Sequence, residues 1–385
     1  MKSSFFLIFI AIVTVVYAFS HYYLYQRTIQ LFAPPPSFKK WIAISYVILA
    51  SFFIGGMFLE KLYPSLLSEW IYKIGTAYLP FLLYFLLLLL SIDLIRILNH
   101  FFHFLPLFSQ HQKTLFGISA IVLVCVIVCI GHINAKHIRI TRIPLTIHKT
   151  VNDNKNIKLL MASDIHLGAI IGESWEKKFL GIVEKEKPDL VLLCGDLIDG
   201  EVAPVLRQQL GKHIQEINTP LGLYAVSGNH EYIGNIETAL SYLESIHIKV
   251  LQDEVLMLPN GIQLVGCKDI QSKYADPKNP TKPLEILLEN IDNTKPVIVM
   301  KHQPLALDEA ADAGVDLQLS GHTHHGQMWP INYITNAIYE LSWGYMKKKN
   351  THFYVTSGFG TWGPSVRLGN YPEVVVFTIT FNTIN

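Results

Sequence analysis

The first third of the chain carries four apolar stretches that contain no Asp, Glu, Lys or Arg. A helix needs about 20 apolar residues to cross the hydrocarbon core of a bilayer. The first stretch is the shortest, and its end at Val16-Tyr17-Ala18 also fits a signal peptide. The pattern predicts a bundle of four transmembrane helices in residues 1–135, with spans at about 5–19, 42–59, 74–92 and 115–133.

After residue 135 the apolar positions come in short runs, separated by segments with helical spacing and regularly placed charges. The run Leu190–Cys194 is uninterrupted, which is typical of a strand buried on both faces. Residues 174–183 predict a helix with Ser174 as its N-cap, and residues 204–217 predict another. This alternation predicts an α/β domain over residues 136–385 with added antiparallel strands.

Five of the strand-like runs are followed at once by Asp, Asn or His. One such residue, Asp196 after Leu190–Cys194, could by itself be a helix cap. Open α/β sheets, however, place ligand sites at the carboxyl ends of their strands, so the five ends are expected to converge. Carboxylate, amide and imidazole groups bind divalent ions, and the set offers enough donors for two ions.

The same residues form an ordered series of motifs. They read Asp164-x-His166, Gly195-Asp196-x-x-Asp199, Gly228-Asn229-His230-Glu231, His302 and Gly321-His322-x-His324. In this order they resemble the calcineurin-like metallophosphoesterases, over about residues 157–327. A later stretch, residues 357–370, resembles a bacterial subgroup of membrane-anchored or exported phosphoesterases. That subgroup usually has Gly after the His-x-His pair, where this chain has His325. The resemblance implies two packed mixed sheets flanked by helices.

The resemblance also implies roles for individual residues. It assigns the first ion to Asp164, His166, Asp196 and His324, and the second to Asp196, Asn229, His302 and His322. Asp196 would bridge the two ions, and such mixed ligands suit Mn, Fe or Zn. Two ions would lower the pKa of a bridging water, so that hydroxide attacks the phosphorus. His230 would act as the general acid and Asp199 would orient it, unless Asp199 only caps a turn. Arg367 is either a phosphate contact or a structural residue in its Gly-rich loop.

His322 and His324 raise a conformational question. Alternate residues of an extended segment point in opposite directions, so both imidazoles can face one site only if the chain turns. Gly321 and Gly326 are the residues expected to permit that turn.

Charge and cysteine content exclude some classes of protein. The net charge is +1, which argues against nucleic acid as a partner. The four Cys do not form the pattern of a disulfide framework. Four basic residues after the last span favour a cytoplasmic catalytic domain, although Arg27, Lys39 and Lys40 weaken that bias. The four are Lys136, Arg139, Arg142 and Lys149.

These features predict a multi-pass membrane protein that hydrolyses a phosphate ester or pyrophosphate. An aromatic stretch at residues 331–350, ending in Lys347-Lys348-Lys349, resembles an element that contacts lipid headgroups. The substrate is therefore either lipid-linked or a soluble phosphodiester, and some relatives cleave UDP-diacylglucosamine. The alternatives are a non-catalytic metal-binding scaffold, or a membrane sensor or transporter with a regulatory phosphatase domain. The absence of charges within the spans argues against an ion path.

Overall fold

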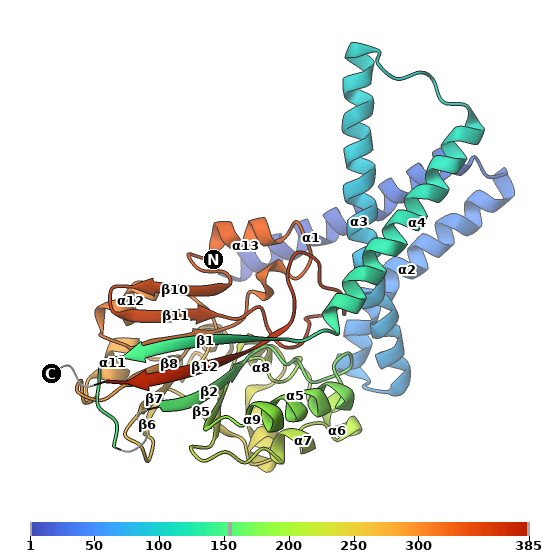
Figure 1. Ribbon diagram of the computed structural model, residues 1–385. Coiled ribbons are helices and arrows are strands. Elements are labelled where there is room, and N and C mark those ends of the chain that lie inside the picture. The colour runs from blue at the N-terminus through green and yellow to red at the C-terminus, as the bar shows by residue number, and fades with distance from the viewer. Residues whose placement is uncertain (1, 153–155, 383–385) are drawn as a thin grey trace. The chain divides into compact units, whose positions relative to one another are not determined.

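The computed structural model describes residues 2–152 and 156–382, and all their side chains except those of residues 2–7, 9 and 10. The chain divides into two compact units, Met1–His132 and Ile133–Asn385 (Figure 1). Each unit is described by itself below.

The N-terminal unit is built from long helices: α1 Lys2–Phe32, α2 Pro36–Leu62, α3 Leu66–Phe102 and most of α4 Gln110–Ala135. Helices α2 and α3 pack backbone to backbone at two glycines. A Cβ on Gly75 would lie 2.4 Å from Cα of Phe53, and one on Gly56 would lie 2.6 Å from Cα of Tyr72. Small residues allow this close approach between membrane helices.

Within the described part of the chain, three helices are long and apolar enough to cross a membrane: α2, α3 and α4. The prediction of four spans was therefore wrong in number, although the three apolar helices still indicate membrane insertion. The first predicted span, residues 5–19, forms part of α1 and is shorter than the roughly 20 residues that a span needs. Some of its side chains, those of residues 5–7, 9 and 10, lie outside the described residues.

The second unit contains two six-stranded sheets. The first has the strand order β1-β12-β2-β3-β4-β5. Its strands are β1 Arg139–Ile147, β12 Glu373–Phe381, β2 Asn156–Ala162, β3 Leu190–Cys194, β4 Leu223–Val226 and β5 Lys249–Leu251. All neighbours pair in parallel except β12 and β2, which are antiparallel. The C-terminal strand thus lies between β1 and β2, inside the sheet.

The second sheet has the order β10-β11-β9-β8-β7-β6. Its strands are β10 Gly344–Lys348, β11 Thr351–Val355, β9 Leu317–Ser320, β8 Val297–Met300, β7 Gln263–Gly266 and β6 Glu254–Met257. The four central strands are parallel, and the two edge strands β10 and β6 are antiparallel to their neighbours.

The two sheets pack face to face, with helices on their outer faces (Figure 1). The central core joins residues such as Leu192, Met161 and Phe377 of the first sheet to Leu264 and Ile298 of the second. On the outer face of the first sheet lie α5 Glu173–Glu186, α6 Ala203–Gln208, α7 Lys212–Gln215 and α9 Ile236–Ser245. On the other outer face lie α11 Leu284–Leu288 and α12 Leu307–Asp312. This arrangement confirms the prediction of two mixed sheets flanked by helices.

Two helix predictions need correction. Helix α5 begins at Glu173 with Gly172 as its N-cap, so Ser174 lies inside the first turn. The helix predicted over residues 204–217 is broken into α6 and α7. The break runs from Gln209 to Gly211, and the φ values of these two residues, 52° and 97°, are incompatible with a continuous helix.

Candidate metal centre

The segments that follow β2 and β3 continue side by side beyond the ends of their strands. The amide of Asp164 donates to Gly195 O at 3.0 Å, and the amide of His166 donates to Asp196 O at 3.0 Å. On the other side, the amide of Gly360 donates to Asp164 O at 2.8 Å. Backbone hydrogen bonds therefore hold three loops together at one edge of the sheets, where the candidate ligands lie.

Many of the candidate ligands have left-handed backbone conformations. Positive φ values occur at Asp164, His166, Asp196, His322 and His324, and range from 45° to 72°. Such values are uncommon for residues with a Cβ and gather at functional sites. At the His-x-His pair the histidines themselves make the turn that was predicted for the two glycines. Gly326 also has a positive φ, of 71°, but Gly321 does not.

Gly321 is required for a different reason. A Cβ at this position would lie 2.1 Å from Oγ of Ser163 and 2.2 Å from Oδ2 of Asp164. Because the glycine has no side chain, the amide of the following His322 reaches Asp164 and lies 3.0 Å from both of its carboxylate oxygens. The close approach of these two loops fixes the orientation of the Asp164 carboxylate.

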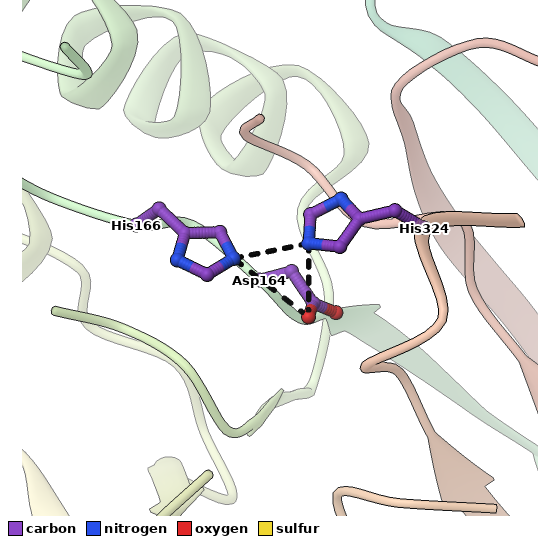
Figure 2. A group of neighbouring side chains, drawn as sticks. All are labelled: Asp164, His166 and His324. Carbon is purple, nitrogen blue, oxygen red and sulfur yellow. Dashed lines mark hydrogen bonds and ion pairs between the residues drawn. The ribbon is translucent and has the colours of Figure 1, made fainter. Parts of the chain in front are cut away.

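Asp164, His166 and His324 form the first of the buried donor groups (Figure 2). Nε2 of His324 lies 3.0 Å from Nε2 of His166 and 3.4 Å from Oδ1 of Asp164. Asp164 and His166 come from the loop after β2, whereas His324 begins the short helix η1 His324–Gly326. Residues far apart in the sequence thus bring three ligand atoms close together.

The second donor group consists of Asp196, His302 and His322. Nε2 of His302 lies 3.1 Å from Oδ2 of Asp196 and 3.2 Å from Oδ1 of Asn229. Nδ1 of His322 lies 2.7 Å from the same Asn229 oxygen. Asn229, the first residue of α8 Asn229–Ile233, therefore adds an amide oxygen to this group.

Asp196 connects the two groups through one oxygen. Its Oδ2, which faces His302, lies 3.9 Å from Nε2 of His166 in the first group. Its Oδ1 accepts a hydrogen bond of 2.9 Å from the amide of His230, which fixes the carboxylate plane. Burial opposes ionisation of Asp196, but His302 and His230 outweigh it and hold the pKa of this carboxyl well below its ordinary value. The charged form is the one that can bridge two cations.

His230 and Asp199 lie beside these groups. Oδ1 of Asp199 is 3.1 Å from Nδ1 of His230 and 3.3 Å from Nδ1 of His166. Burial disfavours the cationic form of His230, but Asp196 and Asp199 more than compensate and raise its pKa to about 9. Asp199 therefore contacts a candidate acid and a candidate ligand at the same time.

The donor set fits divalent metal ions. Within each group the ligand atoms lie within 4.8 Å of one another, and the chain supplies imidazole, carboxylate and amide donors together. Burial, followed by the charge of His302, lowers the pKa of His322 to about 3, so this imidazole keeps a free lone pair at neutral pH. Nδ1 of His302 lies 2.8 Å from Cys194 O, which directs its Nε2 lone pair into the site. These buried His and Asp clusters are consistent with a dimetal site.

Two buried glutamates that support the site were not singled out from the sequence. Glu231 accepts hydrogen bonds from the amides of Ile198 at 2.9 Å and Gly228 at 2.7 Å, and so ties the Asp196 loop to the Asn229 loop. Its place in the Gly-Asn-His-Glu motif was the available signal. Glu373 accepts from the amide of Ser357 and from four side chains of distant segments. Nothing near Glu373 in the sequence indicates that role.

Arg367 and His325 lie close to His324 but are not part of the donor groups. Arg367 is completely buried, and Nη2 of its guanidinium lies 3.1 Å from Nδ1 of His324. The predicted phosphate contact of Arg367 stays a prediction, although this burial favours the structural alternative. His325 is outside the donor groups, because its Nδ1 lies 2.9 Å from Oγ of Ser342 and its ring packs against Trp343.

Comparison with known proteins gives a consistent result. The family model for calcineurin-like phosphoesterases matches residues 157–326. An uncharacterized metallophosphoesterase of Aquifex aeolicus is 34% identical over 251 residues, which are 65% of this chain and 94% of that protein. An uncharacterized metallophosphoesterase of Campylobacter jejuni is 28% identical over 391 residues, covering 97% of this chain and 98% of that protein.

A third relative is a transmembrane protein with a metallophosphoesterase domain from Bos taurus. It is 30% identical over 271 residues, which cover 66% of this chain and 60% of the bovine protein. The match to nearly the whole Aquifex protein and the buried donor groups lead to one conclusion: the chain belongs to the calcineurin-like metallophosphoesterase family, whose members are metal-dependent hydrolases.

Proposed function

We propose that this chain is a membrane-anchored dimetal phosphoesterase that hydrolyses a lipid-linked phosphate ester or pyrophosphate. The observation that carries the proposal is the position of Asp196, one oxygen of which faces both His302 and His166. A bridging carboxylate fixes the spacing of two ions, which is the central requirement of two-metal phosphoryl chemistry. The ligands would be Asp164, His166, Asp196 and His324 for the first ion, and Asp196, Asn229, His302 and His322 for the second.

Metal ions bound there would neutralise the phosphate oxygens and activate a water for attack. The protein's own part is to hold the ligands and to deliver a proton. Asp199 holds the Nδ1 side of His230 and favours its protonated form. Nε2 of His230 is then the atom that protonates the leaving oxygen. Asp199 is a positioning residue in this scheme, because it touches His230 and not the substrate.

The proposal predicts metal-dependent turnover. Full-length protein in detergent should lose activity on bis(p-nitrophenyl) phosphate after chelation with EDTA, and regain it when Mn²⁺ is restored, because the metal ions would supply the Lewis acid of the reaction. Release of p-nitrophenol measures both steps. Turnover that survives chelation and removal of bound metal would contradict the proposal. Failure to hydrolyse any phosphodiester or pyrophosphate in a panel, with two ions bound, would favour the scaffold alternative.

The lipid-linked substrate is supported by an apolar surface next to the donor groups. It consists of α13 Asn332–Ile338, in which no residue is buried, together with Trp329 and Trp362. Its exposed apolar side chains are Trp329, Tyr333, Ile334, Ile338 and Trp362. We call this group the α13 surface.

Aromatic contacts join the α13 surface to the site. The ring of Trp362 lies 6.4 Å from the ring of His230, and the ring of Tyr339, which follows α13, lies 6.0 Å from that of His322. The backbone of Trp329 donates to Leu368 O at 2.8 Å, in the loop that also bonds to Asn134 of α4. Trp, Tyr and Ile side chains exposed together on one surface are typical of an interfacial element.

Two of the three lysines that end the aromatic stretch at residues 331–350 have acidic partners. Nζ of Lys348 lies 2.7 Å from Oδ1 of Asp308 and 2.8 Å from Oε1 of Glu340, and Lys349 pairs with Asp312. Contact with lipid headgroups was predicted for these lysines, but their acidic neighbours already compensate the charges of Lys348 and Lys349. The apolar side chains of α13 therefore carry the proposal of lipid contact.

A triple variant tests the lipid contact. Tyr333→Ser with Ile334→Asn and Ile338→Asn should raise KM at least about tenfold for a phospholipid pyrophosphate in nanodiscs, because apolar burial is lost. KM for bis(p-nitrophenyl) phosphate should stay within about twofold of the wild-type value, because a surface change with no role in binding has only a small effect. Ile286→Asn, an equally exposed isoleucine in α11, is the control. Equal effects on both substrates, or none on the lipid, would exclude the α13 surface.

We also propose that the catalytic unit faces the cytoplasm. The basic residues after α4, among them Lys136, Arg139 and Arg142, support this side. The buried free thiols of Cys194 and Cys267 are compatible with a reducing compartment. A C-terminal green fluorescent protein fusion should fluoresce, whereas an active alkaline phosphatase fusion would reverse the orientation.

A further inference from the structure

Arg367 is the largest fully buried side chain in the described part of the protein. A buried guanidinium is costly unless acceptors surround it. Its Nη1 donates to Ser357 O at 2.7 Å and to Oδ1 of Asn370 at 3.2 Å. Its Nη2 donates to Gly358 O at 3.2 Å and Gly360 O at 2.5 Å, and lies 3.1 Å from Nδ1 of His324. The arginine therefore links the loop of residues 357–360 to a candidate metal ligand.

The contact with His324 has a defined direction. A guanidinium has no acceptor, so Nδ1 of His324 must accept the hydrogen bond from Arg367. The other ring nitrogen, Nε2, then points at Asp164 and His166, where the first ion would bind. The outer nitrogens of two other histidines face acceptors instead, since Nδ1 of His302 lies 2.8 Å from Cys194 O and Nδ1 of His166 lies near Asp199. Of these three histidines, His324 is the one whose Nδ1 faces a hydrogen-bond donor.

The backbone of Arg367 is in turn held by the last turn of α4. The side-chain amide of Asn134 donates to Arg367 O at 2.9 Å and to Asn370 O at 2.7 Å. Asn370 also donates from its own side chain to His325 O at 3.2 Å. Two carbonyls of the loop, one on each side of Leu368 and Gly369, are therefore fixed by one residue at the end of a candidate membrane span.

We propose that Arg367 is a positioning residue that fixes the His324 ring for the first ion, and that Asn134 positions Arg367. This inference rests on the proposed dimetal function. It makes the affinity of one ion depend on Asn134, in the last turn of α4. Residues that orient a metal ligand typically affect metal affinity about 10–100-fold.

The test measures metal binding to the full-length protein in detergent. Bound Mn²⁺ per chain is determined over a range of free Mn²⁺, and electron paramagnetic resonance separates coupled ion pairs from isolated Mn²⁺. Arg367→Met should weaken one of the two ions about 10–100-fold and replace the coupled spectrum with that of an isolated ion. Arg367→Lys, which keeps a donor and the charge, should recover part of the affinity. Asn134→Ala should weaken the same ion by a smaller factor.

His137→Ala is the matched control for Asn134→Ala. It lies in the adjacent turn, its side chain is exposed, and its Nδ1 lies 3.0 Å from the local carbonyl of Ile133. This variant should bind both ions like the wild type. If Arg367→Met does not fold, Arg367→Lys and Asn134→Ala decide the question. Unchanged binding of both ions in these variants, or equal weakening of both, would overturn the inference.

The outcome is separable from that of the proposed function. If the wild type binds a coupled pair of ions but hydrolyses no phosphoester, the proposed function fails, and the Arg367 variants still test the positioning role. If the wild type is active and the Arg367 variants retain the coupled pair, only the positioning role fails.

Discussion

Replacing Asp196 with asparagine is expected to abolish turnover without unfolding the protein. The two side chains have the same shape, but asparagine is neutral and offers a single oxygen. Its amide nitrogen cannot bind a cation, and as a donor it would clash with His302 or with the His230 amide, both of which now face carboxylate oxygens. We expect kcat on bis(p-nitrophenyl) phosphate to fall by about 10³-fold, the scale seen when one preorganised electrostatic group is removed.

Asp189→Asn is the control for that change. Asp189 lies just before β3, whereas Asp196 follows the end of the same strand. Oδ2 of Asp189 accepts a hydrogen bond of 2.7 Å from the amide of Lys158. The control should stay within about twofold of wild-type activity, as expected for a site remote from the chemistry. Metal content and thermal melting of both variants separate loss of ions from loss of fold. An Asp196→Asn protein that binds two ions and turns over normally would refute the bridging role.

Replacing Glu373 with alanine should strongly lower the free energy of unfolding of the protein. Its carboxylate is fully buried and accepts from Thr141, Tyr354 and Thr356 hydroxyls, the Trp343 indole and the Ser357 amide, at 2.8–3.2 Å. Each buried donor left without a partner costs about 1–3 kcal/mol, although rotating hydroxyls find substitutes. We expect the free energy of unfolding to fall by about 4 kcal/mol. The melting temperature of a unit this size should then fall by about 10 °C.

Two further variants make the Glu373 test specific. Glu373→Gln keeps one acceptor oxygen and should lose less than half as much stability, because the hydroxyls of Thr141 and Tyr354 can turn to accept from the new amide. Glu254→Ala removes an exposed glutamate at the first position of another strand, β6, and should leave the melting temperature unchanged. Differential scanning fluorimetry in detergent measures all three. Equal melting temperatures for Glu373→Ala and wild type would show that the network contributes nothing.

The sequence predicted the elements whose signals are local. The uninterrupted apolar run before Asp196 becomes β3, because a buried strand needs apolar side chains on both faces. The ends of five such apolar runs also carried the candidate ligands. Their convergence followed from strand geometry together with the family motifs, since parallel strands present their carboxyl ends at one edge.

Features that depend on contacts between distant residues were not predictable. The burial of Arg367 is decided by carbonyls of Ser357, Gly358 and Gly360 and by His324, which no local pattern connects. The turn at the His-x-His pair was assigned to glycines, since glycine is the usual left-handed residue, but packing forces His322 and His324 into it. The span count failed at α1, where apolar length is close to the minimum that a bilayer requires.

The position of β12 has a consequence for how the protein is made. This strand is translated after the other strands of both sheets, yet it lies between β1, which follows α4, and β2. Until β12 is translated, the nascent domain exposes an unpaired edge on each of those two strands. The first sheet is therefore completed only after all its other strands have been translated. A chain that terminates before Glu373 would lack β12. The edges of β1 and β2 would then stay unpaired and open to aggregation or proteolysis.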